Sequence, residues 1–168
     1  MILEKGDIMM SLGTSDTLFL PLENPVPNTF ANVLCHPNEA KNFMAMIVYK
    51  NGSLTRQSIR DQHASGTWQS FNDALKSAPP GCIGYSGFYY LVPEISPRAQ
   101  GTYFFKDGER VSGIPDHLQP RALIEFQFMA MKRHVTKMGL DPKRIFSTGM
   151  IFVEIEMYRW RIVEFGYS

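Results

Sequence analysis

The stretch Ser11-Leu12-Gly13-Thr14-Ser15-Asp16-Thr17 lies near the N-terminus between two short apolar runs, residues 8–10 and 18–20. Two β-prone runs joined by a compact Gly/Ser/Asp cluster predict a β-hairpin. Gly13 allows a tight turn, and Thr14 and Ser15 place hydroxyls beside free backbone N–H groups. Because several donors then converge on one small concavity, such a turn can bind a phosphate. From these residues alone, an ordinary hairpin turn is the simpler explanation.

Length and composition narrow the class of protein. The chain has 168 residues, enough for one domain with a buried core. Its formal net charge of +1 gives no electrostatic footprint for nucleic acid or an anionic membrane. The longest uncharged apolar run, residues 43–49, is too short to span a bilayer, and no secretory signal is visible. Cys35 and Cys82 lack CxxC spacing, so a reduced, cytoplasmic setting is expected.

Downstream of the hairpin, strand and helix patterns alternate, which predicts the α/β class. Residues 43–49 form an apolar run suited to a buried strand. The turn Asn51-Gly52-Ser53 then breaks this run, and Ser53 is expected to cap a helix through Arg60. The other expected elements are a helix at 68–76, a strand or loop at 84–93, a hairpin at 101–111, a helix at 118–138 and a buried strand at 144–149.

The remaining residues show no familiar catalytic or metal motif. The four histidines are scattered without metal-ligand spacing, so we expect no metal site, and neither a P-loop nor GxGxxG follows a strand. His134 is expected to be a cation at the C-terminal end of the 118–138 helix. The residues alone therefore indicate an α/β protein with one candidate phosphate-binding turn.

Taken together, the segments resemble the C-terminal domain of xylulose kinases, which belong to the FGGY family of sugar kinases. The resemblance extends from about Gly6 to Gly149 and implies one incomplete lobe, over residues 1–149, of the ribonuclease-H-like ATPase fold of actin and hexokinase. The segments that carry it are SLGTSDTLFL (11–20), FMAMIVYKNGSL (43–54), GFYYLVPEISP (87–97), RALIEFQFMA (121–130) and IFSTG (145–149).

The resemblance implies ATP-dependent phosphorylation of D-xylulose to D-xylulose 5-phosphate, with Mg²⁺ bridging the phosphates. The family's Gly-Thr at the terminal phosphates of ATP corresponds to Gly13 and Thr14, with Ser15 beside them. Gly149 matches the first glycine of the family's adenosine-binding motif, whereas Met150 stands where the second glycine is expected. Phe126 also departs from the family, which tends to have glycine at that position.

Two further departures concern activity. The family's catalytic aspartate belongs to a Gly-rich segment upstream of the hairpin, and neither Asp7 nor Asp16 matches it, so no catalytic residue is expected in these 168 residues. The sugar-binding N-terminal lobe is also missing. The alternative function is therefore a catalytically inactive splice or gene-model fragment that at most binds nucleotide or pairs with a full-length kinase.

Residues 150–168 leave the family pattern altogether. Apolar and other residues alternate over positions 151–158 with a period of two, which is typical of a strand. Two explanations are open, an edge strand or the product of an alternative exon or intron read-through. The abrupt end of the resemblance favours the second explanation.

Overall fold

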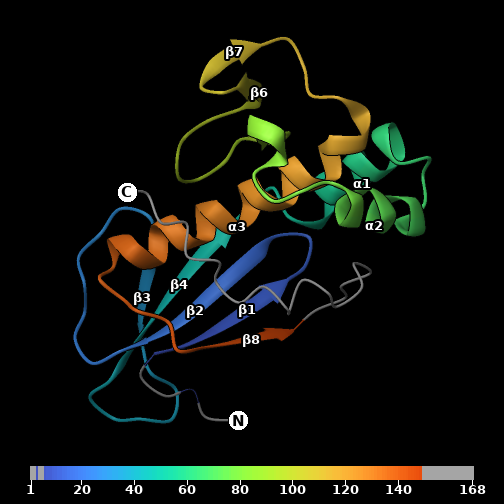
Figure 1. The fold of residues 1–168 in the computed structure, drawn as a ribbon. Coiled ribbons are helices and arrows are strands. Elements are labelled where there is room, and N and C mark those ends of the chain that lie inside the picture. Colours follow the sequence, from blue (N-terminus) through green and yellow to red (C-terminus); the bar gives the residue numbers. More distant parts are fainter. Residues whose placement is uncertain (1–2, 4–5, 149–168) are drawn as a thin grey trace.

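The computed structural model describes Leu3 and residues 6–148 (Figure 1). Two expectations concern residues outside this range: the nucleotide contact at Gly149 and the divergent tail at 150–168 lie outside the described residues. Among the residues described, no helix is both long and apolar enough to cross a membrane.

The main sheet has five strands in the order β3-β4-β2-β1-β8. Three neighbouring pairs are antiparallel, namely β1 with β2, β2 with β4, and β4 with β3, whereas β8 runs parallel to β1. The expected first hairpin is confirmed, because β1 and β2 pair directly on either side of Gly13-Thr14-Ser15. The strands are β1 (Asp7–Leu12), β2 (Asp16–Leu22), β3 (Asn32–Cys35), β4 (Phe43–Tyr49) and β8 (Arg144–Thr148).

The helices are α1 (Ser53–His63), α2 (Trp68–Ser77) and α3 (Gln119–Lys137), with short 3₁₀ turns η1 (Cys82–Gly84) and η2 (Asp116–Leu118). All three α-helices were expected. The predicted capping role of Ser53 is wrong, because Gly52 is the N-cap of α1 and no side chain caps that end. Ser53 instead uses its backbone N–H to contact the first hairpin.

A smaller antiparallel sheet contains β5 (Tyr85–Tyr90), β6 (Gly101–Lys106) and β7 (Glu109–Val111). The expected hairpin is confirmed, and Asp107 and Gly108 at its turn both have positive φ, which suits a tight two-residue connection. Phe126 of α3 packs against Phe88, Tyr89 and Tyr90 of β5 with ring centroids 5.2–6.0 Å apart. The large ring at this departure from the family pattern is thus accommodated by an aromatic cluster.

The long helix α3 runs from the helical layer across the main sheet (Figure 1). It contributes residues to two hydrophobic cores. Its first half packs with α1, α2 and β5 around Phe71 and Tyr89, both of which are fully buried. Its second half contributes Met131 and Val135 to the core on one face of the main sheet. α3 therefore holds the helical layer and the sheet in one fixed arrangement.

The other face of the main sheet is less protected. In β2 and β4 the alternate residues Phe19, Met46 and Val48 are only half-buried, while their neighbours are buried. β8 is a strand as expected, but the prediction that it is buried is wrong, since Ile145 is 50% exposed. The physical reason is that β8 forms the edge of the sheet among the strands described.

His134 also differs from expectation. Instead of a cation at a helix end, it is a buried side chain on the face of α3 that meets the sheet. Its Nδ1 atom lies 2.9 Å from the Tyr49 hydroxyl, and its ring stacks on Phe30. Burial lowers the pKa of His134, and the nearby charges of Arg133 and Lys137 lower it further, so the neutral form is favoured.

Candidate functional site

The turn between β1 and β2 presents hydroxyl groups to solvent. Thr14 is exposed at its tip, and Gly13 and Ser15 beside it are half-buried. Within the part of the chain that the structure describes, neither the Thr14 nor the Ser15 hydroxyl makes a side-chain hydrogen bond. Both hydroxyls are therefore available to an anionic ligand that approaches the end of the hairpin.

The backbone of this turn rests directly on the loop between β4 and α1. The Ser53 N–H donates to the Gly13 carbonyl at 2.8 Å. Gly52 lies so close that a methyl carbon added there would be 2.7 Å from the Thr14 carbonyl oxygen and 2.8 Å from that of Gly13. Only glycine permits this contact, because side-chain carbons essentially never approach a backbone atom within 3.0 Å.

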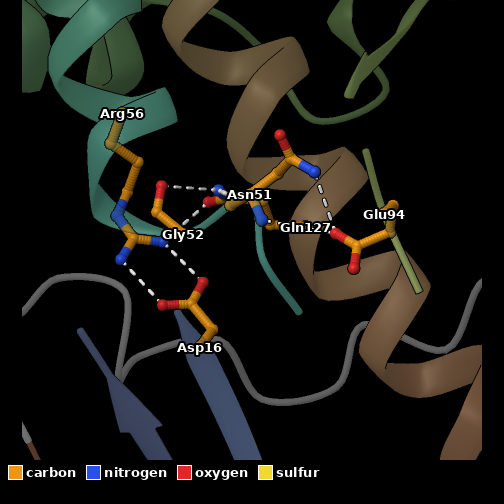
Figure 2. Close-up of polar contacts among 6 residues, drawn as sticks. All are labelled: Asp16, Asn51, Gly52, Arg56, Glu94 and Gln127. Carbon is orange, nitrogen blue, oxygen red and sulfur yellow. Dashed lines mark hydrogen bonds and ion pairs between the residues drawn. The ribbon is translucent and has the colours of Figure 1, made fainter. Parts of the chain in front are cut away.

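A buried ion pair joins the same turn to α1 (Figure 2). Arg56 donates from Nη1 to Asp16 Oδ2 at 2.7 Å and from Nη2 to Oδ1 at 2.9 Å, and Asp16 is fully buried. Burial raises the pKa of Asp16, whereas Arg56 and a hydrogen bond from the Gly13 N–H act in the opposite direction. Because both carboxylate oxygens accept from a permanently charged guanidinium, we assign Asp16 as ionised at neutral pH.

Gln127 extends this contact to α3. Its Oε1 atom accepts from Arg56 Nη1 at 2.9 Å, and its Nε2 atom donates to the Asn51 carbonyl at 2.8 Å. The amide of Gln127 is thus oriented from both sides, and it connects α1 to the loop that supports the turn (Figure 2).

Asn51 and Glu94 complete the set. The Asn51 side chain donates to Glu94 Oε2 at 2.9 Å and to the Val92 carbonyl at 3.1 Å, while Glu94 also accepts from the Lys50 N–H. These contacts fix the loop after β4 against the segment that follows β5. We call the five buried side chains the turn-support network: Asp16, Asn51, Arg56, Glu94 and Gln127.

The expected site residues thus fall into two groups. Gly13, Thr14 and Ser15 lie together in one exposed turn, as the sequence predicts, whereas Gly149 lies outside the described residues. The last residue of β8, Thr148, pairs with Ser11, so this strand ends level with the turn. Among the described residues, no group of three or more His, Cys, Asp or Glu side chains could hold a metal ion.

Comparison with known proteins identifies related sequences, although no protein-family model matches the chain. Xylulose kinase from Rattus norvegicus is 45% identical over 153 residues, covering 89% of this chain and 28% of the relative. Xylulose kinase 2 from Arabidopsis thaliana is 38% identical over 159 residues, covering 86% of this chain and 28% of the relative. The chain therefore spans less than a third of the length of the curated relatives it matches.

Solved structures support the same resemblance at the level of the fold. Xylulose kinase from Bifidobacterium adolescentis superposes with a TM-score of 0.73 at 19% identity, covering 88% of this chain and 30% of that one. Plasmodium falciparum glycerol kinase with ADP gives a TM-score of 0.62 at 14% identity, covering 87% of this chain and 31% of that one. The predicted fold is confirmed: the chain has part of the α/β fold of FGGY carbohydrate kinases, which is the actin and hexokinase type of ATPase fold.

Proposed function

We propose that this chain, a homologue of xylulose kinases over most of its length, forms the phosphate-binding part of the ATP-binding lobe of such a kinase. The complete enzyme would transfer a phosphoryl group from ATP to D-xylulose and form D-xylulose 5-phosphate. The observation that supports this proposal is the exposed Gly13-Thr14-Ser15 turn with two hydroxyls unengaged among the described residues.

The chemistry of the turn suits the terminal phosphates of ATP. A hydroxyl at Thr14 and the neighbouring backbone amides can donate to phosphate oxygens and stabilise charge that develops during transfer. The buried carboxylate of Asp16 is neutralised by Arg56, so it does not oppose an anion at this position. When bound, ATP supplies the phosphoryl group, and Mg²⁺ would be held by phosphate oxygens and water, as is common in kinase sites.

We further propose that the 168 residues need the rest of the kinase, which supplies the catalytic aspartate and binds the sugar. Two surfaces support this view, the half-buried apolar face of the main sheet and the exposed strand β8. Residues 1–149 would then be the kinase segment, with 150–168 diverging from it, in a cytoplasmic protein. The same surfaces favour a second candidate function, in which an inactive fragment pairs with a full-length kinase.

The test of ATP contact uses rat xylulose kinase in which residues 6–148 of this chain replace the matching segment. In this chimera, Thr14→Ala should lower kcat by about 10²-fold, a typical loss for one donor to developing negative charge. Thr102→Ala, at an exposed position of β6, is the control and should change nothing. Unchanged kcat and KM for ATP in Thr14→Ala, with the parent chimera active, would exclude the proposed phosphate contact.

A second measurement tests the dependence on the rest of the kinase. The purified 168-residue chain should form no ADP in response to D-xylulose, because a missing base and an unpositioned substrate remove most of the rate enhancement. Turnover at rates typical of kinases would contradict this. Restoration of activity on mixing the chain with a kinase lacking the same segment would support pairing.

A further inference from the structure

We infer that the turn-support network is a positioning device for the phosphate-binding turn, with Arg56 as its central positioning residue. This inference rests on the proposed function of that turn. The five side chains come from β2, the loop after β4, α1, α3 and the segment after β5, and all are buried. None of them forms the exposed tip, so their effect on a ligand would act through the backbone of the turn.

Gly13 is held through its backbone on two sides. Its N–H faces the Asp16 carboxylate and lowers the pKa of that group, and its carbonyl accepts from the Ser53 N–H at 2.8 Å. The residue before Thr14 is therefore fixed by one contact within the hairpin and one from the start of α1. The direction in which the Thr14 hydroxyl and amide point depends on these two contacts.

Arg56 holds both of these contacts in place. Its guanidinium binds the two oxygens of Asp16 and, through Nη1, the Gln127 side chain. It thereby fixes the carboxylate that holds Gly13, and as part of α1 it fixes the helix that begins at Ser53. Arg56 also neutralises a carboxylate that would otherwise lie unpaired behind a site for phosphate.

The loop on which the turn rests is itself held by the network. Gln127 donates to the Asn51 carbonyl, and Asn51 is held in turn by Glu94. These bonds determine where Gly52 lies, and Gly52 lies so close to the turn that no side-chain carbon fits between them. The network therefore sets the turn from two sides, through the Asp16 carboxylate and through Gly52.

The chain contains a matched control for this device. At the opposite end of the same hairpin, Arg144 binds both oxygens of the buried Asp7 at 2.7 and 2.8 Å. Loss of that pair removes a bidentate arginine–carboxylate contact from the same sheet but leaves the turn supports in place. The Arg144 side chain is 53% exposed and that of Arg56 is 10% exposed. A purely structural ion pair and a positioning pair should therefore differ in their effect on the turn.

The first experiment uses the full 168-residue chain and needs no activity. Amide hydrogen exchange of Gly13 and Ser53 should become at least tenfold faster in Arg56→Met than in the unaltered chain, after correction for the global stability measured on each variant. Arg144→Met should leave these two amides unchanged after the same correction. Equal protection of both amides in Arg56→Met and the unaltered chain would overturn the inference.

The second experiment measures kinetics in the rat chimera described above. Arg56→Met should lower kcat/KM for ATP by about 10²-fold, the usual effect of misplacing a reacting group by about 1 Å. KM for D-xylulose should change less than twofold, and Arg144→Met should leave kcat/KM for ATP unchanged. Arg56→Lys should recover only part of the loss, because an ammonium group does not bridge two carboxylate oxygens in the same way.

If Arg56→Met folds poorly, a double variant separates a positioning role of the ion pair from a purely stabilising one. Replacing a whole buried ion pair with apolar residues is often neutral for stability, so Asp16→Leu/Arg56→Met should recover the melting temperature. The inference requires that kcat/KM for ATP stays low in this double variant, since the contacts to Gly13 remain lost. Recovery of both quantities would show that the pair only stabilises the fold.

These outcomes also separate this inference from the proposed function. A loss of kcat in Thr14→Ala together with normal kinetics in the double variant overturns the inference and leaves the proposed function standing. Normal kinetics in Thr14→Ala overturns the proposed function, and a change in kcat/KM on loss of Arg56 would then have another cause. Amide exchange at Gly13 still reports whether the network holds the turn.

Discussion

Substitution of Gly52 by alanine tests the close contact between the β4–α1 loop and the hairpin turn. The added methyl carbon would lie 2.7 Å from the Thr14 carbonyl oxygen, 2.8 Å from the Gly13 carbonyl oxygen and 2.9 Å from the Asp16 nitrogen. All three neighbours are backbone atoms, so no flexible side chain can move aside. Ordinary contact begins at 3.4 Å, and the loop and turn must therefore separate.

The size of the effect follows from this displacement. Forcing one extra carbon into a packed site costs about 1–3 kcal/mol. For a chain of this length, each kcal/mol lowers the melting temperature by about 2–4 °C. The same shift moves Gly13 and Thr14 by several tenths of an ångström, so kcat/KM for ATP in the rat chimera should fall by about tenfold to 10²-fold.

The assay combines thermal unfolding of the 168-residue chain with ATP kinetics of the chimera. Gly113→Ala is the control, because no atom lies within 4 Å of its added carbon and its φ is not positive. This control should leave both quantities within error. If Gly52→Ala behaves like Gly113→Ala in melting and in kinetics, the contact does not set the position of the turn and the reasoning is refuted.

Three further predictions concern His134, the two cysteines and Phe126. Stability should fall as the pH drops below about 6.5, because the unfolded chain binds a proton that buried His134 resists, and His134→Gln should reduce this fall in melting temperature. Cys35 is exposed, whereas burial raises the pKa of Cys82 to about 11, so a thiol reagent should label only Cys35 until the chain is unfolded in urea. Phe126→Ala should lower the free energy of unfolding by about 3 kcal/mol in urea denaturation, since the ring loses its contacts with three aromatic neighbours.

Much of the fold was predictable because its signals are local. The apolar run at β4, the Asp107-Gly108 turn and the 19-residue helix α3 each show a periodicity or a turn signal within one segment. Burial was less predictable, since it depends on what packs against an element. His134 and β8 show this, because the sequence marks one as a helix-end cation and the other as a core strand, while the fold buries the first and exposes the second.

The exposed turn of the candidate site was predictable for the same reason, whereas the network that supports the turn was not. Gly13, Thr14 and Ser15 are consecutive, so turn chemistry alone indicates them. Asp16 and Arg56 are 40 residues apart, and Arg56 and Gln127 are 71 apart, so no local pattern joins them. A charged residue in a sequence is expected to be solvated. One sequence signal could have indicated the network: Arg56 lies on the same face of α1 as the apolar Ile59. A charge buried on such a face needs a partner of opposite charge, and the sequence does not show which element supplies that partner.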